Sequence, residues 1–176
     1  LMCLHDARRA ARTRDGEVVV LDEQDRSRWD REEIATGLAA LDRSVRLSLN
    51  RDPSAYQIQA AIAGEHARAA SSSDTDWLQI ARLYAALLVV QDTPVVRLNR
   101  AAAVAMADGP DAGLRLLAEL EVELARFHPF HAARAELLRR TGRQPEAAAA
   151  YERAIGLCIN AIERSYLERR LREITG

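Results

Sequence analysis

Residues 94–158 decide the fold: PVVRLNRAAAVAMADGPDAGLRLLAELEVELARFHPFHAARAELLRRTGRQPEAAAAYERAIGLC. Apolar residues recur along this stretch at helical spacing, and Gly and Pro interrupt the pattern at 109–110, 129 and 142–145. The interruptions predict four helices, over 94–107, 110–123, 129–140 and 145–158. Thr93 is placed to cap the first helix, and Pro94 occupies its first position, where a missing N–H has no cost.

Small residues repeat within these four helices. Ala101 and Ala135 lie 34 positions apart, and so do Gly113 and Ala147. This is the period of tetratricopeptide helix pairs. We therefore predict stacked antiparallel pairs, in which small side chains allow the two helices to approach closely.

The second unit matches that repeat better than the first. Ala135, Gly142, Ala147, Tyr151 and Ala154 fall at its small, turn, small, aromatic and small positions. We expect Gly142 to adopt the left-handed turn between the helices and Tyr151 to fill the gap toward the next pair. A last helix, over about 161–174, is predicted to cover the end of the stack with a polar outer face.

Three further helices are predicted upstream, over about 30–49, 53–66 and 75–90, the first opened by a capping-box-like Asp30 and Glu33. Trp77, Ile80, Ala81 and Tyr84 resemble the opening signature of the repeat, yet they are out of phase with the downstream units. We interpret the 75–90 helix as the second of a pair, and the opposite phase remains open.

The N-terminal residues differ in character from the rest of the chain. Residues 1–10 look like the end of a helix, Asp15-Gly16 is a turn signal, and Val18-Val19-Val20-Leu21 is the strand candidate. The chain does not open with Met, and we expect it to be a fragment. The predicted fold is all-α, a right-handed superhelix of antiparallel pairs with a short extended or hairpin segment near the N-terminus. Residues 1–29 form a helix end and charged linker, and 30–176 the helical domain, within one globular unit.

Composition narrows the classes of function. The 25 basic residues, every one an Arg, balance 26 acidic ones, and the net charge is -1. Such a balance argues against direct binding of nucleic acid or an anionic membrane. Cys3 and Cys158 form no CxxC pattern, and no apolar stretch approaches the ~18 residues of a membrane span. A cytoplasmic location is expected.

Motifs that carry chemistry are missing from the sequence. There is no Gly-rich phosphate loop, GxSxG elbow, HExxH set or Cys/His pairing. The four His residues are interpreted as packing or surface residues, and the carboxylates as solvated helix faces. We expect no enzyme activity, no cofactor and no metal.

A polar cluster on the first helices of the two pairs is the candidate binding site. Such helices line the concave groove of a repeat stack, where Arg offers a bidentate fork to a peptide or carboxylate. The predicted groove residues are Arg97, Asn99, Arg100, His131, Arg134, Glu136, Arg139 and Arg140. Bridging between neighbouring helices, or exposure to water, is the competing interpretation. In residues 22–30, a charged loop anchored by a buried Trp29 is favoured slightly over a docking surface.

Several long runs resemble the C-terminal extension of one group of bacterial extracytoplasmic-function sigma factors. They are LMCLHDARRAARTRDGEVVVLDEQDRSRWD, DTDWLQIARLYAAL, PVVRLNRAAAVAMADGP and HAARAELLRRTGR, so the resemblance covers nearly the whole chain. The extension in that group is a tetratricopeptide-like domain that follows the DNA- and polymerase-binding regions. Its linker motif falls here on Asp25, Arg26 and Trp29, and its LLRRTGR-type motif on residues 137–143. Residues 126–129 depart from the acidic and Tyr residues of many relatives.

The resemblance implies control of transcription initiation. The extension would contact its own sigma core, RNA polymerase, or a regulatory protein or peptide, while promoter binding belongs to regions absent from this chain. Two alternatives remain open. One is a stand-alone tetratricopeptide adaptor, and the other is a small-molecule sensor with an enclosed apolar pocket near Trp77, Tyr84 and Arg100.

Overall fold

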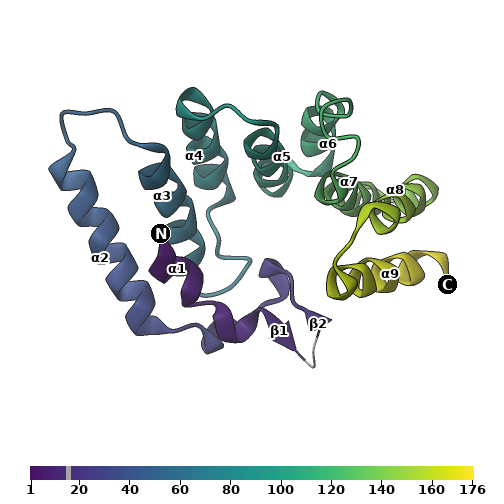
Figure 1. Cartoon of the computed structure of the whole chain (residues 1–176), viewed down its shortest axis with the longest axis horizontal. Coiled ribbons are helices and arrows are strands. Elements are labelled where there is room, and N and C mark those ends of the chain that lie inside the picture. The colour runs from purple at the N-terminus through teal and green to yellow at the C-terminus, as the bar shows by residue number, and fades with distance from the viewer. Residues whose placement is uncertain (15–16) are drawn as a thin grey trace. The chain divides into compact units, whose positions relative to one another are not determined.

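The computed structural model describes residues 1–14 and 17–176 and is predominantly helical (Figure 1). The chain divides into two compact units at Asp92 and Thr93. Unit 1 holds residues 1–14 and 19–92, and unit 2 holds residues 17–18 and 93–176. The prediction from the sequence was one globular unit with an internal boundary at residues 29–30, and the observed boundary at residues 92–93 differs from it.

Unit 1 is built from four α-helices, α1 (Met2–Asp6), α2 (Arg31–Leu47), α3 (Ala55–Arg68) and α4 (Trp77–Val90). Short 3-10 turns η1 (Arg9–Ala11), η2 (Leu21–Glu23) and η3 (Arg26–Arg28) connect α1 to α2. Asp30 caps α2 by accepting from the backbone N–H groups of Glu32 and Glu33. The reciprocal capping box lies instead at Ser54 and Gln57, at the start of α3.

Successive helices of unit 1 pack on one another, α1 on α2, α2 on α3 and α3 on α4. Leu4, Trp29, Ile34 and Ala67 belong to one buried cluster. Helix α4 packs on α3 and follows it in the chain, so it is the second helix of that pair. This agrees with the prediction that the helix around Trp77 is the second of a pair.

The extended segment is a hairpin of two short strands, β1 (Thr13–Arg14) and β2 (Glu17–Val18). Of the predicted strand 18–21, only Val18 lies in β2, and Leu21 begins η2, whose i→i+3 hydrogen bonds replace strand pairing. The predicted Asp15-Gly16 turn lies outside the described residues.

Unit 2 contains α5 (Pro94–Asp108), α6 (Pro110–Ala118), α7 (His128–Arg140), α8 (Gln144–Leu157) and α9 (Ala161–Thr175). The helices pack as the pairs α5/α6 and α7/α8, α6 also contacts α7, and α9 covers α8 (Figure 1). The predicted antiparallel stacking is confirmed. Helix α6 ends earlier than predicted, and tight turns follow it, in which Leu120 and Leu124 remain buried.

The small residues of the repeat lie where the helices touch. Ala101, Ala135 and Ala147 are each fully buried. A Cβ on Gly113 would lie 2.5 Å from the Ala105 Cβ and 2.9 Å from the Ala101 carbonyl oxygen. Real Cβ contacts are not this short, so only Gly permits the observed approach of α6 to α5.

The turn and aromatic positions of the repeat also behave as predicted. Gly142 has φ 77° and ends α7 in the left-handed region, which Gly adopts at little cost. Tyr151 is 2% exposed and packs among Ala135, Leu138 and Leu167. Helix by helix, no part of the described chain combines the length and apolarity needed to cross a membrane.

Candidate functional site

The linker motif of Asp25, Arg26 and Trp29 is an internal anchor of unit 1. Asp25 caps η3 by accepting from the backbone N–H and hydroxyl of Ser27 at 2.9 and 2.6 Å. This cap directs the next side chain, Arg26, inward, where only 4% of the residue is exposed. The Arg26 guanidinium lies 5.0 Å from the ring centroid of Trp29, which is 3% exposed.

Arg26 holds together the end of α3 and the start of α4. Its Nη1 donates to the carbonyl oxygens of His66 and Ala69 at 2.9 and 3.0 Å, and its Nη2 donates to Thr75 Oγ1 at 2.9 Å. The carbonyls at a helix C-terminus lack intrahelical partners and attract cations. These contacts agree with the charged loop anchored by a buried Trp that the sequence analysis favoured.

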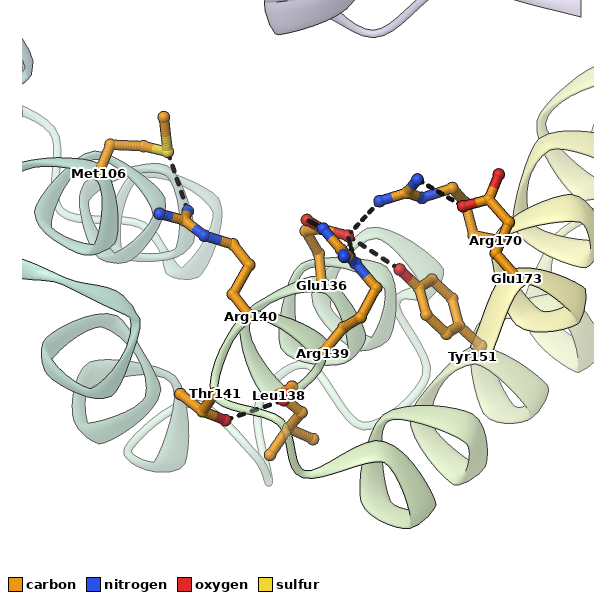
Figure 2. Close-up of polar contacts among 9 residues, drawn as sticks. All are labelled: Met106, Glu136, Leu138, Arg139, Arg140, Thr141, Tyr151, Arg170 and Glu173. Carbon is orange, nitrogen blue, oxygen red and sulfur yellow. Dashed lines mark hydrogen bonds and ion pairs between the residues drawn. The ribbon is translucent and has the colours of Figure 1, made fainter. Parts of the chain in front are cut away.

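A second polar cluster lies in unit 2, and Figure 2 shows it. Its centre is Glu136 of α7, one of the predicted groove residues. The Glu136 carboxylate accepts from Arg139 Nε at 3.0 Å and Nη2 at 2.6 Å, and from the Tyr151 hydroxyl at 3.0 Å. Arg170 of α9 donates to the same carboxylate at 2.9 Å and to Glu173 at 2.6 Å. The cluster therefore joins α7, α8 and α9.

Electrostatics fix the charge state of this cluster. Burial raises the pKa of Glu136, but hydrogen bonds from Arg139 and Arg170, together with their charges, outweigh it and lower the pKa to about 2. Burial, reinforced by the neighbouring Glu136 carboxylate, raises the pKa of Tyr151 well above its ordinary value. Glu136 is therefore ionised and Tyr151 neutral at physiological pH.

Arg140 lies beside this cluster and has a different kind of partner. Its Nη1 lies 3.0 Å from the Met106 sulfur of α5, a weak acceptor (Figure 2). Asn99 is exposed. It precedes Met106 by seven residues, which is about two helical turns, so both lie on the same face of α5. Arg140 thus reaches from α7 toward α5, and its guanidinium has no carboxylate contact among the described residues.

The other predicted groove residues are placed differently. Arg97 and Arg134 form ion pairs with Glu123 and Glu121 at 3.3 and 2.9 Å, bridges to the segment that follows α6. His131 is 9% exposed, and its Nε2 lies 2.9 Å from the Ala125 carbonyl oxygen. Arg100 is half-buried.

The contribution of α9 to the Glu136 cluster was not predicted from the sequence. Arg170 and Glu173 looked like members of a solvated face, and the hydroxyl of Tyr151 was not assigned a partner. Spacing along the chain carries no signal for these contacts, because Arg170 lies 34 residues from Glu136. The 15% exposure of the Arg170 side chain results from the packing of α9.

A pocket of about 640 Å³ that is open to solvent lies in unit 1 among α2, α3 and α4. Apolar residues such as Leu41, Val45 and Ile58 line it together with polar ones such as Asp42 and Arg46. Neither Trp77, Tyr84 nor Arg100, the residues expected around a sensor pocket, lines it.

Comparisons with known proteins place the chain beside sequences of unassigned activity. Residues 1–45 match a sequence family described as "Family of unknown function (DUF6596)". An uncharacterized protein of Rhizobium meliloti (strain 1021) is 43% identical over 171 residues, which cover 97% of this chain and 40% of that protein. The chain thus spans about two fifths of the length of this relative. No solved structure matches the chain.

Proposed function

We propose that this chain is the regulatory protein-interaction domain of an extracytoplasmic-function sigma factor. The contact face, made by Arg139 and Arg140 of α7 together with Asn99 of α5, would contact the sigma core, RNA polymerase or another regulatory protein. The role is non-enzymatic and cytoplasmic. The resemblance of the linker and LLRRTGR motifs supports the proposal, and a relative of more than twice this length leaves room for promoter-binding regions.

The observation that carries the proposal is the state of Arg139 and Arg140. Arg139 is held in a fixed orientation by Glu136, while Arg140 has a methionine sulfur as its hydrogen-bond acceptor. A guanidinium beside a weak acceptor loses little when it turns to a carboxylate of a partner, and it gains a charge-assisted bidentate bond. Arg139, which Glu136 already holds in place, would lose little side-chain entropy on binding the same partner.

The test is promoter activity of the full-length factor, with and without this domain. Equal promoter activity of the factor with the domain and the factor without it would reject a regulatory role. Arg140→Glu then tests the face, because it reverses a charge without breaking an ion pair, and Arg139→Ala tests the preorganised neighbour. Arg153→Glu is the matched control, since Arg153 is an exposed residue of α8.

We expect both α7 variants to change promoter activity by at least about tenfold, which corresponds to ~1.4 kcal/mol of lost contact, while the control has no effect. Circular dichroism of each variant separates loss of contact from loss of folding. Equal activity of Arg140→Glu, the Arg153 control and the wild type would reject the assignment of this face.

A second candidate function, small-molecule sensing, would use the open pocket among α2, α3 and α4 and not the enclosed one expected near Trp77. Pockets of a few hundred Å³ with apolar linings accommodate small ligands. Ala61→Trp would fill it, because Ala61 lies in its lining. A sensor would lose its response to an apolar effector in this variant, whereas a protein-binding domain would keep its promoter activity.

A further inference from the structure

Three metal-binding side chains meet at the end of unit 2, where α7 begins and α8 passes into α9. His128 is the first residue of α7, Cys158 caps the end of α8, and Glu163 lies in the first turn of α9. Their ligand atoms all lie within 4.8 Å of one another. His128 Nε2 and a Glu163 carboxylate oxygen are only 2.9 Å apart.

We propose that His128, Cys158 and Glu163 form a binding site for a zinc-like divalent transition metal. Imidazole nitrogen, thiolate sulfur and carboxylate oxygen are each established zinc ligands, and three such ligands leave a fourth position for water. A thiolate and a carboxylate together carry two negative charges, which neutralise a divalent cation. A thiolate in the set favours zinc over magnesium or calcium, which prefer oxygen ligands.

The present separations require only small side-chain movements. Tetrahedral zinc with ordinary bond lengths would place the sulfur, nitrogen and oxygen atoms about 3.4 to 3.6 Å apart. The cluster is therefore already close to the required size. Binding replaces the thiol proton of Cys158, which now points to the Asn160 carbonyl oxygen at 3.4 Å, and that proton is released to solvent.

The surroundings hold the ligands and leave access to solvent. Cys158 is 1% exposed, whereas the side chains of His128 and Glu163 are 25% and 43% exposed. Asn160 caps α9 and its amide donates to the second carboxylate oxygen of Glu163 at 3.4 Å. Arg164 donates to the Cys158 carbonyl oxygen at 3.1 Å and so fixes the backbone of the thiol-bearing residue. Partners of this kind orient metal ligands.

These residues show no ligand spacing along the chain, so no metal is expected from the sequence. His128 and Cys158 are 30 residues apart and belong to different helices. The stacking of α7, α8 and α9 brings them together, and a bound ion would join the last helix to the pair beneath it.

The experiment is titration of the metal-free chain with Co²⁺, followed by displacement with Zn²⁺. One equivalent of Co²⁺ should give a thiolate-to-metal charge-transfer band and the intense visible bands of tetrahedral coordination. Zn²⁺ should abolish both, raise the midpoint of thermal unfolding and bind more weakly as pH falls, since the ligands must be deprotonated.

Three ligand variants and two controls assign the site. Cys158→Ser should remove the charge-transfer band, and His128→Gln and Glu163→Gln should each weaken Zn²⁺ binding by at least about tenfold. Cys3→Ser and Glu168→Gln, outside the cluster, should bind as the wild type does. His128 and Glu163 are partly exposed, so their variants keep the test valid should Cys158→Ser fail to fold. Absence of a charge-transfer band in the wild type, or equal binding by the ligand variants, would overturn the proposal.

Discussion

Replacement of Gly113 by Ala tests the close packing on which the stack depends. The added Cβ would meet the Ala105 Cβ at 2.5 Å, the Ala101 carbonyl oxygen at 2.9 Å and Leu137 Cδ1 at 2.9 Å. The Ala101 carbonyl oxygen is a backbone atom, and the Ala105 Cβ is bonded directly to the backbone. Neither atom can move unless α5 moves with it. Overpacking of a core costs about 1 to 3 kcal/mol. Higher helix propensity offsets about 0.5 to 1 kcal/mol of this cost, so we expect a net loss of up to about 2.5 kcal/mol.

Gly156→Ala is the matched control within the same unit. Gly156 also lies in a helix, yet a Cβ there would have no atom within 4 Å. Only the propensity gain applies, so this variant should be more stable by about 0.5 to 1 kcal/mol. Urea unfolding monitored by circular dichroism measures both changes, and for a chain of this length 1 kcal/mol shifts the thermal midpoint by about 2 to 4 °C. If Gly113→Ala stabilises the protein as Gly156→Ala does, the helices do not depend on a small residue at this contact.

Three further substitutions address single contacts. Arg26→Ala leaves two buried carbonyl groups without a donor, and we expect urea unfolding to show a loss of about 3 kcal/mol. Thr93→Ala removes the acceptor for the Val96 N–H at the start of α5 and should cost about 1 kcal/mol in the same assay. Glu136→Gln removes a carboxylate whose pKa falls from 4.5 to about 2 on folding, so its stabilisation is complete above pH 4.5 and is lost as pH falls toward 2. Because this side chain is 36% exposed, solvent screening reduces the expected loss at pH 7 to about 1 to 2 kcal/mol. Unfolding curves across this range should converge at acid pH, and a constant difference would contradict the assignment.

The sequence predicted those parts of the fold that local chemistry determines. Thr93 and Pro94 begin α5, and Gly142 ends α7, because caps and positive φ angles depend on one or two residues. The 34-residue period located Ala101 and Ala135 in the core, since a small residue is required wherever two helices nearly touch. The end of α6 was predicted less well. Leu120 and Leu124 continue the apolar pattern in tight turns that bury them without a regular helix.

The candidate site could be predicted only in part, because its partners come from distant helices. Glu136 and Arg139 share one face of α7, so their proximity follows from helical spacing. Arg170 reaches them only through the packing of α9, and no pattern in its own helix indicates that contact. The His128 and Cys158 pair is hidden for the same reason. Local periodicity determines which face a residue occupies, and tertiary packing determines what that face meets.

Most residues of the LLRRTGR-type motif have a structural role. Only a few of its side chains are therefore candidates for binding a partner. Within residues 137–143, Leu137 and Leu138 are core, Thr141 donates to the Leu138 carbonyl oxygen, Gly142 makes the turn, and Arg143 pairs with Glu146 at 2.7 Å. Arg139 is engaged by Glu136, so Arg140 is the member of the motif whose guanidinium has no carboxylate partner among the described residues. Leu137, Leu138, Thr141 and Gly142 serve the fold. Arg139 and Arg143 pair with acidic side chains near the surface, and Arg139 also belongs to the proposed contact face. On the proposed function, a difference in promoter activity between Arg140→Glu and the Arg153 control would report on binding, because the described contacts of the stack do not use the Arg140 charge.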